Sequence, residues 1–468
     1  MEIETRKIAE EEIKRKLPLG GIVYSRRKGF QPFSIPPIED YVSIMGEERI
    51  EDLQKLAAKL KGVKILEVNA TAVGGGVAEM LYSQVPFLNQ LGLEDEWKVM
   101  SGTQSFYQVT KSLHNLLQGK RGTLTPEMTR TYYSILRENA DIYAEDYKSY
   151  NPDIVIVHDP QPLGLARYLR EEGGKWLWRC HIDVEEETLE TNPALWEFIT
   201  FWAGFYDAVI FSGAHYVVEY WPLQKYVIPP FIDPLSLKNK ELSADEITKV
   251  LEKYGIAPNI PLLVQVGRFD PWKGIDTSIN AYRIVKKEID CQLVIAGGMA
   301  SDDPEGEMIF NRICGEVKGD PDIHVIRLPE DVEVSALEVN ALQRAASVIL
   351  QPSIKEGFGL VVTEAMWKRK AVITREVGAI PLQVRDGATG FFITSAKKAA
   401  GKIIRLLKDP DMARLMGEKA HEYVKEHFLM PDRLADYLRV ANYFINGEVD
   451  RNSIISYHPW FKLSKRKS

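Results

Sequence analysis

Two series of short apolar runs alternate along the chain with longer stretches that carry a helical period. The runs of the first series cover residues 64–69, 153–158, 176–181 and 207–212. Those of the second series cover residues 262–267, 292–297, 323–327, 348–351 and 371–374. Continuous apolar strands between helices are typical of parallel sheets that are covered on both faces. The pattern therefore predicts an α/β protein that contains two Rossmann-like domains.

A proline-rich segment separates the two series. Residues 226–234 read YVIPPFIDP, and proline continues neither a helix nor a central strand. We therefore expect a linker here, with one Rossmann-like domain at 61–232 and a second Rossmann-like domain at 258–428. Residues 1–60 are predicted to form an N-terminal extension. The helical pattern at 430–446 follows the second series and is expected to return to the first domain.

Open parallel sheets bind their ligands beyond the carboxyl ends of the strands. Two such sheets predict a deep cleft between the two domains, with the chemistry in the loops that follow the strands.

Composition and charge exclude several classes of protein. The chain has 468 residues, of which 45% are hydrophobic, and its net charge is −7. A mildly acidic chain binds phosphate backbones poorly, so we expect no nucleic-acid partner. The first residues are a charged run without an apolar signal, and no stretch is long and apolar enough for a membrane helix. The three cysteines fit neither a zinc site nor a disulfide framework, which favours a cytoplasmic protein.

Candidate chemistry in the first half lies where strands end. The sequence GGGVAE at residues 74–79 follows the first strand, and Gly75 and Gly76 would let the backbone approach an anion at a helix N-terminus. The alternative is a tight turn. Asp159 ends the second strand and could bind a sugar hydroxyl or cap the next helix. His181 ends the third strand and could donate to a hydroxyl or serve a structural role. The histidines lack metal-ligand spacing, so we expect no metal site.

The loops of the second half carry more charge. The run GRFDPWKG at residues 267–274 places Arg268 and Lys273 after a strand, where they could clamp two phosphate groups. The alternative is a surface pair between Arg268 and Asp270.

The run PSIKEGFGLVVTEA at residues 352–365 follows another strand. Glu356 would stand beside a sugar, and Glu364 would bind ribose hydroxyls from the following helix. The intervening backbone amides would form an anion seat at a helix N-terminus; they belong to Gly357, Phe358, Gly359 and Leu360. The alternative is that both glutamates are capping or solvated residues.

Together these motifs resemble the retaining GT-B glycosyltransferases of family GT4, over about residues 62–428. They are most similar to the glycosyltransferring trehalose synthases and the related trehalose phosphorylases. The segments that carry this narrower resemblance are 74–79, 157–162, 176–183, 268–274, 302–306 and 338–344. We interpret the acidic pair within 302–306 as a loop feature rather than a metal motif.

The resemblance implies roles for the donor-binding residues. Arg268 and Lys273 would hold the diphosphate of the donor and stabilise its leaving charge. Glu364 would bind the ribose, and Glu356 with the amides after it would hold the 3- and 4-hydroxyls of the donor sugar. Gly75 and Gly76 would approach the phosphates.

For the remaining site residues the resemblance implies contacts with the sugars. His181 would contact the 6-hydroxyl or a nearby carbonyl, and Asp159 would lie near the acceptor and the reacting carbon. An acceptor pocket in the first domain could be lined by Trp178, Arg179, Gln108 and His114; the alternative for each is a core or surface residue.

The predicted activity is that of a retaining hexosyltransferase that forms trehalose from UDP-, ADP- or GDP-glucose and free glucose. We expect neither a cofactor nor a metal, and a homodimer as the oligomeric state. The main alternative is a trehalose phosphorylase that uses phosphate and glucose 1-phosphate. Further alternatives are another GT4 transferase, a sugar-nucleotide epimerase of similar fold, and a non-catalytic protein that binds nucleotide sugars.

Overall fold

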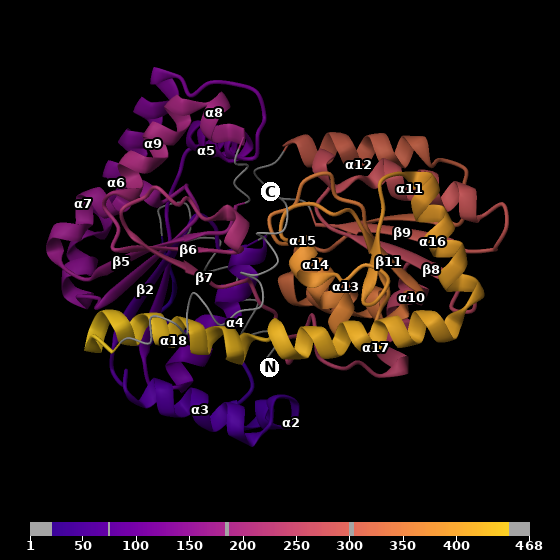
Figure 1. Ribbon diagram of the computed structural model, residues 1–468, viewed down its shortest axis with the longest axis horizontal. Helices are drawn as coiled ribbons and strands as arrows, with labels where there is room; N and C mark the ends of the chain where they lie inside the picture. The colour runs from indigo at the N-terminus through magenta and orange to yellow at the C-terminus, as the bar shows by residue number, and fades with distance from the viewer. Residues whose placement is uncertain (1–20, 74, 183–186, 299–303, 449–468) are drawn as a thin grey trace. The chain divides into compact units, whose positions relative to one another are not determined.

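The computed structural model describes residues 21–73, 75–182, 187–298 and 304–448. The acidic pair at residues 302–303 and the first glycine of the 74–79 segment lie outside this part. The chain forms two compact units, one made of Met1–Pro230 with Pro431–Ser468 and the other of Phe231–Met430. Each unit is built around its own sheet (Figure 1).

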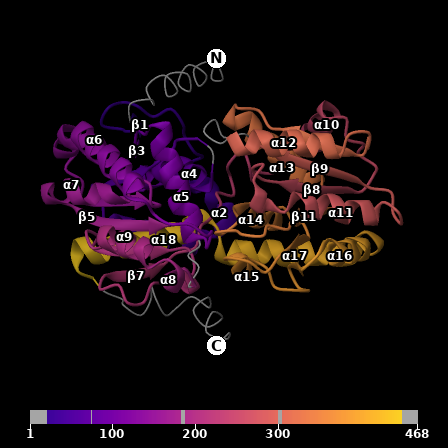
Figure 2. The same cartoon turned by 90° about the horizontal axis from the view of Figure 1, so that it is seen from above.

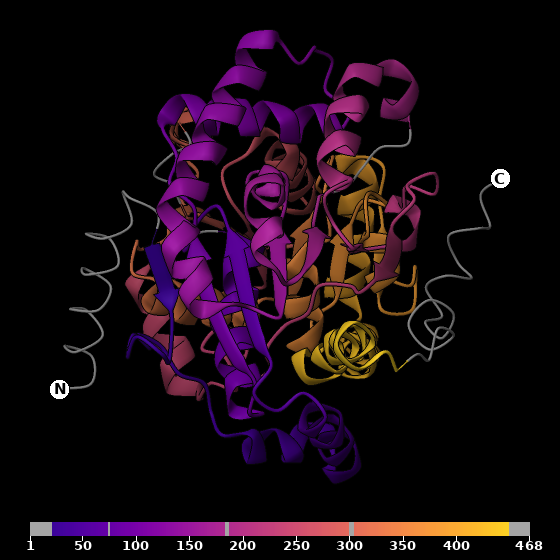
Figure 3. The same ribbon diagram turned by 90° about the vertical axis from the view of Figure 1, so that its left-hand side faces the viewer.

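The sheet of the first unit faces the viewer in Figure 3, and its strand order is β1-β3-β2-β4-β5-β6-β7. All pairs are parallel except β1–β3. The strands are β1 (Gly21–Tyr24), β2 (Lys64–Asn69), β3 (Glu94–Val99), β4 (Ile154–His158), β5 (Lys175–Cys180), β6 (Ala208–Phe211) and β7 (Gln224–Val227). The α-helices are α2 (Val42–Met45), α3 (Glu47–Ala58), α4 (Gly76–Gln90), α5 (Gln104–Leu117), α6 (Pro126–Tyr150), α7 (Ala166–Leu169), α8 (Glu187–Thr191), α9 (Pro193–Ala203) and α18 (Met430–Asn446).

The sequence predicted an N-terminal extension at residues 1–60, but residues 21–60 are packed into the first unit. Strand β1 pairs with β3 and buries Val23 completely. Helix α3 buries Ile50, Leu53 and Ala57. These residues are therefore an integral part of the first unit. The sequence did not indicate this, because a four-residue strand is too short to show a periodic pattern.

The sheet of the second unit has the order β10-β9-β8-β11-β12-β13, and all its pairs are parallel. The strands are β8 (Leu262–Val266), β9 (Gln292–Gly297), β10 (Ile323–Arg327), β11 (Val348–Gln351), β12 (Val372–Thr374) and β13 (Gly390–Phe392). Helices lie on both faces of this sheet (Figure 2). They are α10 (Ala244–Lys253), α11 (Ile275–Val285), α12 (Pro304–Glu316), α13 (Val332–Ala345), α14 (Leu360–Trp367), α15 (Ile380–Gln383), α16 (Ala396–Lys408) and α17 (Pro410–His427).

Local sequence explains where several helices begin. Thr125 accepts a hydrogen bond from the amide of Met128, and Pro126 occupies the first position of α6. Ser243 and Glu246 form a reciprocal capping box at the start of α10. Both arrangements satisfy amide groups that a helix leaves unpaired at its N-terminus.

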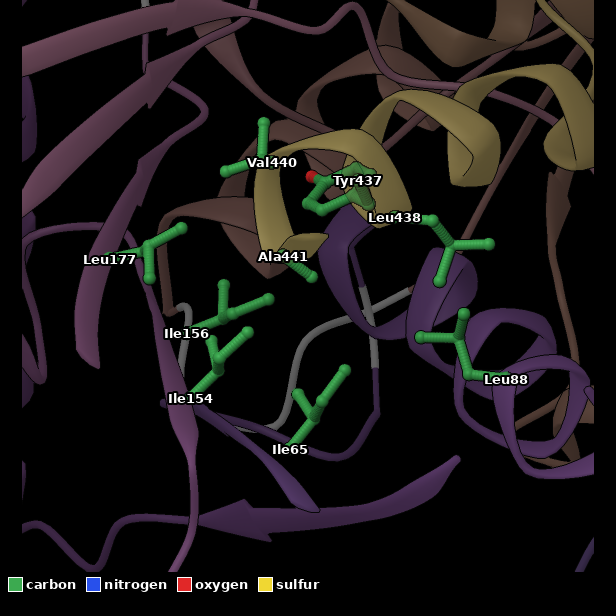
Figure 4. Close-up of a pocket in the computed structure, with 9 residues that line it drawn as sticks. All are labelled: Ile65, Leu88, Ile154, Ile156, Leu177, Tyr437, Leu438, Val440 and Ala441. Carbon is green, nitrogen blue, oxygen red and sulfur yellow. The ribbon is translucent and has the colours of Figure 1, made fainter. Parts of the chain in front are cut away.

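Helix α18 packs on one face of the first sheet. Its residues Tyr437, Leu438, Val440 and Ala441 line a small apolar cavity together with Leu88 and strand residues of β2, β4 and β5 (Figure 4). The cavity volume of about 10 Å³ is enough for one water molecule at most. It is therefore a packing defect of the core and too small for a sugar.

Candidate active site

The strand order of the second sheet reverses between the neighbours β8 and β11, and the predicted donor loops follow these two strands. Parallel sheets bind ligands at such a switch point. The two loops contact each other, since the amide of Ile354 donates to the carbonyl of Trp272 at 2.7 Å. A Cβ at Gly274 would lie 2.1 Å from the carbonyl oxygen of Pro352, so glycine is required for this approach.

Lys273 and Glu356 form an ion pair at this switch point. The ammonium of Lys273 lies 2.9 Å from Oε1 and 2.7 Å from Oε2 of Glu356. Oε2 also accepts hydrogen bonds from Ser353 Oγ at 2.9 Å and Gln351 Nε2 at 3.2 Å. Burial by itself would raise the pKa of Glu356, but Lys273 and these donors outweigh it and hold the pKa below its usual value. The carboxylate is therefore ionised and held in one orientation.

Arg268 is in a different environment. Its side chain is 54% exposed, and its Nη2 lies 3.9 Å from Oδ2 of Asp270. A pair of that length in solvent contributes little stability. The guanidinium can therefore turn toward an anion without breaking a strong interaction.

The backbone between the two glutamates forms the start of α14. Gly359 precedes the helix with φ of +81°. The carbonyl of Gly357 accepts from the amide of Ala379 at 3.0 Å, and the carbonyl of Phe358 accepts from the amide group of Gln383. The segment from Gly357 to Leu360 is thus fixed by hydrogen bonds, and the first amides of α14 are directed as a helix N-terminus requires for an anion.

Glu364 lies on the buried side of α14 and is 1% exposed. Its Oε1 lies 3.0 Å from the ammonium of Lys238, and its Oε2 accepts from Gln343 at 3.4 Å. The neighbouring Lys368 donates to Asn239 Oδ1 at 3.0 Å, and burial lowers the pKa of Lys368 to about 7. Lys238 and Gln343 were not predicted, because neither lies at the end of a strand.

In the first unit, helix α4 begins at Gly76 and its cap residue Gly75 has φ of +97°. The two glycines lie just beyond β2, as the motif predicted. The strand order reverses between β2 and β4, so this turn and the end of β4 lie at the switch point of the first sheet.

Asp159 and His181 meet at the ends of β4 and β5. Oδ1 of Asp159 accepts from the amide of His181 at 2.9 Å, and the amide of Asp159 donates to the carbonyl of Arg179 at 2.9 Å. Asp159 has φ of +66°, a strained value that is uncommon outside glycine and recurs at functional sites. It does not cap the following 3-10 helix Leu163–Leu165, whose cap position is Pro162.

Burial changes the titration of both side chains. It raises the pKa of Asp159 to about 6 and lowers the pKa of His181 well below its usual value. Near neutral pH the site therefore holds an ionised carboxylate beside an uncharged imidazole.

A chain of hydrogen bonds leads from His181 into the sheet. Its Nε2 lies 2.9 Å from Nδ1 of His158, and Nε2 of His158 lies 2.6 Å from Oε2 of Glu67. Oε1 of Glu67 accepts from Gln84 at 2.5 Å. Glu67 was not predicted as a site residue, although a glutamate inside the apolar strand β2 is a usable signal.

The predicted walls of an acceptor pocket need correction. Trp178 is 1% exposed and Arg179 is 0% exposed, so neither lines an open pocket. The guanidinium of Arg179 instead donates to the carbonyls of Ile210 and Ile228 and lies over the ring of Tyr437. Gln108 and His114 lie on α5, where Gln108 is exposed and His114 is half-buried.

Two classes of feature are absent from the described part of the chain. No group of three or more histidine, cysteine or acidic side chains there could hold a metal ion. No described helix is both long and apolar enough to span a membrane.

Comparison with known proteins identifies the family. Residues 67–218 match the model "Trehalose synthase, N-terminal domain", and residues 246–423 match "Glycosyl transferases group 1". A trehalose synthase of Pyrococcus horikoshii is 46% identical over 408 residues, which are 86% of this chain and 96% of that protein. A trehalose phosphorylase of Pleurotus pulmonarius is 28% identical over 462 residues, which cover 88% of this chain and 62% of the phosphorylase.

Among solved structures, sucrose-phosphate synthase from Thermosynechococcus elongatus matches with a TM-score of 0.64 at 19% identity, covering 82% of this chain and all of that one. The GT-B fold class predicted from the motifs is confirmed. The phosphorylases are only distant relatives. The identity and coverage shared with the Pyrococcus protein show that this chain belongs to the trehalose synthase family of glycosyltransferases.

Proposed function

We propose that the protein is a retaining glucosyltransferase that forms trehalose from a nucleoside-diphosphate glucose and free glucose. The observation that carries the proposal is the Lys273–Glu356 pair at the switch point of the second sheet, in a chain of the trehalose synthase family. The pair offers a cation for a diphosphate and a fixed carboxylate for sugar hydroxyls within one cluster.

Donor binding follows from this cluster. The ammonium of Lys273 has three protons and is held by one carboxylate, so it can contact a phosphate while it keeps Glu356 in place. Arg268 is exposed and able to reach a second phosphate. We assign the ribose to Glu364 and the sugar hydroxyls to Glu356 and the amides that follow it.

The chemical step requires stabilisation of a departing diphosphate. Its loss from C1 leaves an oxocarbenium-like centre and increases the negative charge on the phosphate. Fixed cations that face this charge stabilise the transition state more than the ground state. The departing phosphate oxygen takes the proton of the attacking hydroxyl on the same face of the sugar, which retains the α configuration without a covalent intermediate.

We assign the acceptor end of the reaction to Asp159 and His181. A carboxylate whose pKa is about 6 is ionised at neutral pH, and its negative charge stabilises the positive charge that develops at the reacting carbon. The uncharged His181 can exchange a hydrogen bond with a sugar hydroxyl.

A phosphorylase reaction is the second candidate, and the environment of Glu364 argues against it. A reaction with inorganic phosphate involves no ribose, so it leaves the contact that we assign to Glu364 without a ligand. Glu364 is a buried carboxylate with Lys238 as its partner. A nucleotide donor therefore fits this residue better than phosphate.

Product analysis tests the proposal. The protein is incubated with glucose and UDP-, ADP- or GDP-glucose, and separately with trehalose and phosphate. Trehalose in the first set alone supports the synthase, and glucose 1-phosphate in the second supports the phosphorylase. The same assay after treatment with EDTA tests the expectation that no metal is needed.

Two further expectations concern the state of the protein in the cell. We expect a homodimer, which light scattering of the purified protein tests. We also expect a cytoplasmic location, which is consistent with the absence of a disulfide among Cys180, Cys291 and Cys314 in the described residues. Fractionation of cells that express the full chain tests it.

A further inference from the structure

We propose that Glu67 and His158 are positioning residues that fix the tautomer of His181, so that His181 presents Nδ1 to a sugar hydroxyl as a hydrogen-bond acceptor. The ligand in this statement rests on the proposed function, whereas the tautomer is a property of the free protein.

The three residues lie on one face of the first sheet. Glu67 pairs with Ile156 in register, and His158 pairs with Arg179. Positions two apart on a strand share a face, as do paired residues of parallel neighbours. Glu67, His158 and His181 therefore form a row across β2, β4 and the end of β5.

The geometry at the two histidines is that of an in-plane hydrogen bond. The ring centroids lie 5.2 Å apart, the ring planes differ by 13°, and Nδ1 of His158 is 2.9 Å from Nε2 of His181. Two coplanar rings joined edge to edge through these nitrogens have such a centroid separation. A single proton therefore lies between the two nitrogens.

The position of that proton follows from the carboxylate at the other end. Oε1 of Glu67 accepts from Nε2 of Gln84, and a carboxylate also accepts at its second oxygen, so Nε2 of His158 carries the proton of its bond to Oε2 of Glu67. A neutral imidazole has one N–H group, which leaves Nδ1 of His158 as an acceptor. Nε2 of His181 must then carry the proton, and Nδ1 of His181 is left with a lone pair.

The surroundings of His181 keep its ring uncharged. The buried guanidinium of Arg179 lies on the same face of the sheet as His181. Burial first, and Arg179 and His158 next, lower the pKa of His181 well below its usual value. Asp159 is the other charged group at His181 and contacts its backbone amide. An added proton on His158 would reverse the arrangement and turn Nδ1 of His181 into a donor.

The second ring nitrogen of His181, Nδ1, is left for a ligand. His181 is partly exposed, and within the described residues its Nδ1 makes no hydrogen bond. The same side chain was singled out by the family resemblance as a sugar contact. The hydrogen bonds from His181 to His158 and from His158 to Glu67 explain how His181 is held in one tautomer.

NMR of the free protein tests the assignment without any substrate. Histidine is labelled with ¹⁵N, and long-range ¹H–¹⁵N spectra distinguish Nδ1–H from Nε2–H tautomers. His158→Gln and His181→Gln variants assign the signals among the eight histidines. At neutral pH we expect Nε2–H for both His158 and His181. An Nδ1–H form of His181 overturns the proposal.

The variant Glu67→Gln removes the charge but keeps the shape of the side chain. Since an amide can donate as well as accept, we expect a mixture of His181 tautomers and a fall in turnover of tenfold or more. The matched control is Glu426→Gln, which removes a carboxylate 3.6 Å from His427 and should change neither readout. An unchanged His181 tautomer in Glu67→Gln overturns the proposal.

The two readouts separate this inference from the proposed function. Should no donor yield trehalose while the wild-type spectrum shows the expected tautomers, the proposed function fails and the hydrogen-bonded row stands. The wild-type spectrum reports the tautomer of His181 directly, so it tests the proposal even where Glu67→Gln does not fold.

Discussion

The ammonium of Lys273 lies 2.7 Å from one carboxylate oxygen of Glu356 and 2.9 Å from the other. The two residues are 83 positions apart in the sequence and come from the loops after β8 and β11. Their side chains are 17% and 11% exposed, so the pair is largely removed from solvent. The cation that we assign to the diphosphate is therefore held in position by the carboxylate that we assign to the donor sugar.

The first prediction concerns the charge of Lys273. Lys273→Met keeps most of the side-chain volume but removes the cation that we assign to the leaving group. We expect turnover to fall about 100- to 1000-fold, equivalent to about 2.7–4 kcal/mol. The loss also leaves Glu356 buried without its main partner, which should lower the free energy of unfolding by about 1–3 kcal/mol. Steady-state kinetics and urea unfolding measure the two effects.

Two further variants separate catalysis from stability. Arg268→Met should also lower turnover, but it should leave the unfolding free energy unchanged because the Arg268 side chain is exposed. The double variant Lys273→Met/Glu356→Gln removes both charges and should recover stability but not activity. Full activity in either single variant would contradict the proposed role of the two cations.

The second prediction concerns Gly359. A Cβ at this position would lie 3.0 Å from Cγ of Glu356, and the backbone has φ of +81°. Gly359→Ala should therefore strain the backbone by about 1–2 kcal/mol and displace the Glu356 side chain. We expect both a lower melting temperature and a large loss of turnover.

Gly255→Ala is the matched control. Gly255 has φ of +66°, belongs to the same unit, and has nothing within 4 Å of an added Cβ. This variant should lose a similar amount of stability and keep its activity. Equal losses of activity in the two variants would show that Gly359 acts only through stability.

Hydrophobic periodicity was sufficient for most of the fold but not for β3. The nine apolar runs correspond to β2, β4, β5, β6, β8, β9, β10, β11 and β12. Strand β3 reads EDEWKV, yet Asp95, Glu96 and Lys98 are 1%, 2% and 1% exposed. Glu96 is paired with Ser25 and Arg27, and Lys98 is paired with Asp146. These partners are distant in sequence, so the residues of β3 alone look too polar for a buried strand.

The candidate site shows the same limit. Strand ends identified Lys273, Glu356 and Glu364 because ligands bind there. The partners that orient them, among them Lys238, lie on other elements and carry no local signal. Glu67 lies within a strand, and only the fold shows that it lies beside His158.

The third prediction concerns the carboxylate of Glu364. Glu364→Gln would weaken the hydrogen bonds that we assign to the ribose, which for a charged acceptor contribute about 1.5–3 kcal/mol. We expect KM for the nucleotide sugar to rise about tenfold or more with a smaller change in kcat. The control is Glu338→Gln, since Glu338 is also buried and paired with a lysine, Lys253. A rise in KM for both variants would point to a general loss of folding rather than to ribose binding.

The last prediction concerns the pH dependence that Asp159 imparts. Its pKa is about 6 in the folded protein and about 3.9 in an unfolded chain. If the ionised form supports the reaction, kcat/KM should rise with pH up to about 6 and then level off. Asp159→Asn should have a much lower rate and lack this rise.

The raised pKa of Asp159 also determines how this residue makes the free energy of unfolding change with pH. Between about pH 4 and pH 6 the folded state binds more protons at Asp159 than the unfolded state does, so this residue makes stability fall as pH rises. Above pH 6 both states are ionised and the effect is constant. Asp159→Asn should therefore gain stability relative to the wild type between pH 4 and pH 6 and no more above it. Urea unfolding at several pH values measures this difference, and a difference that stays flat across the range would show that the carboxyl of Asp159 titrates normally.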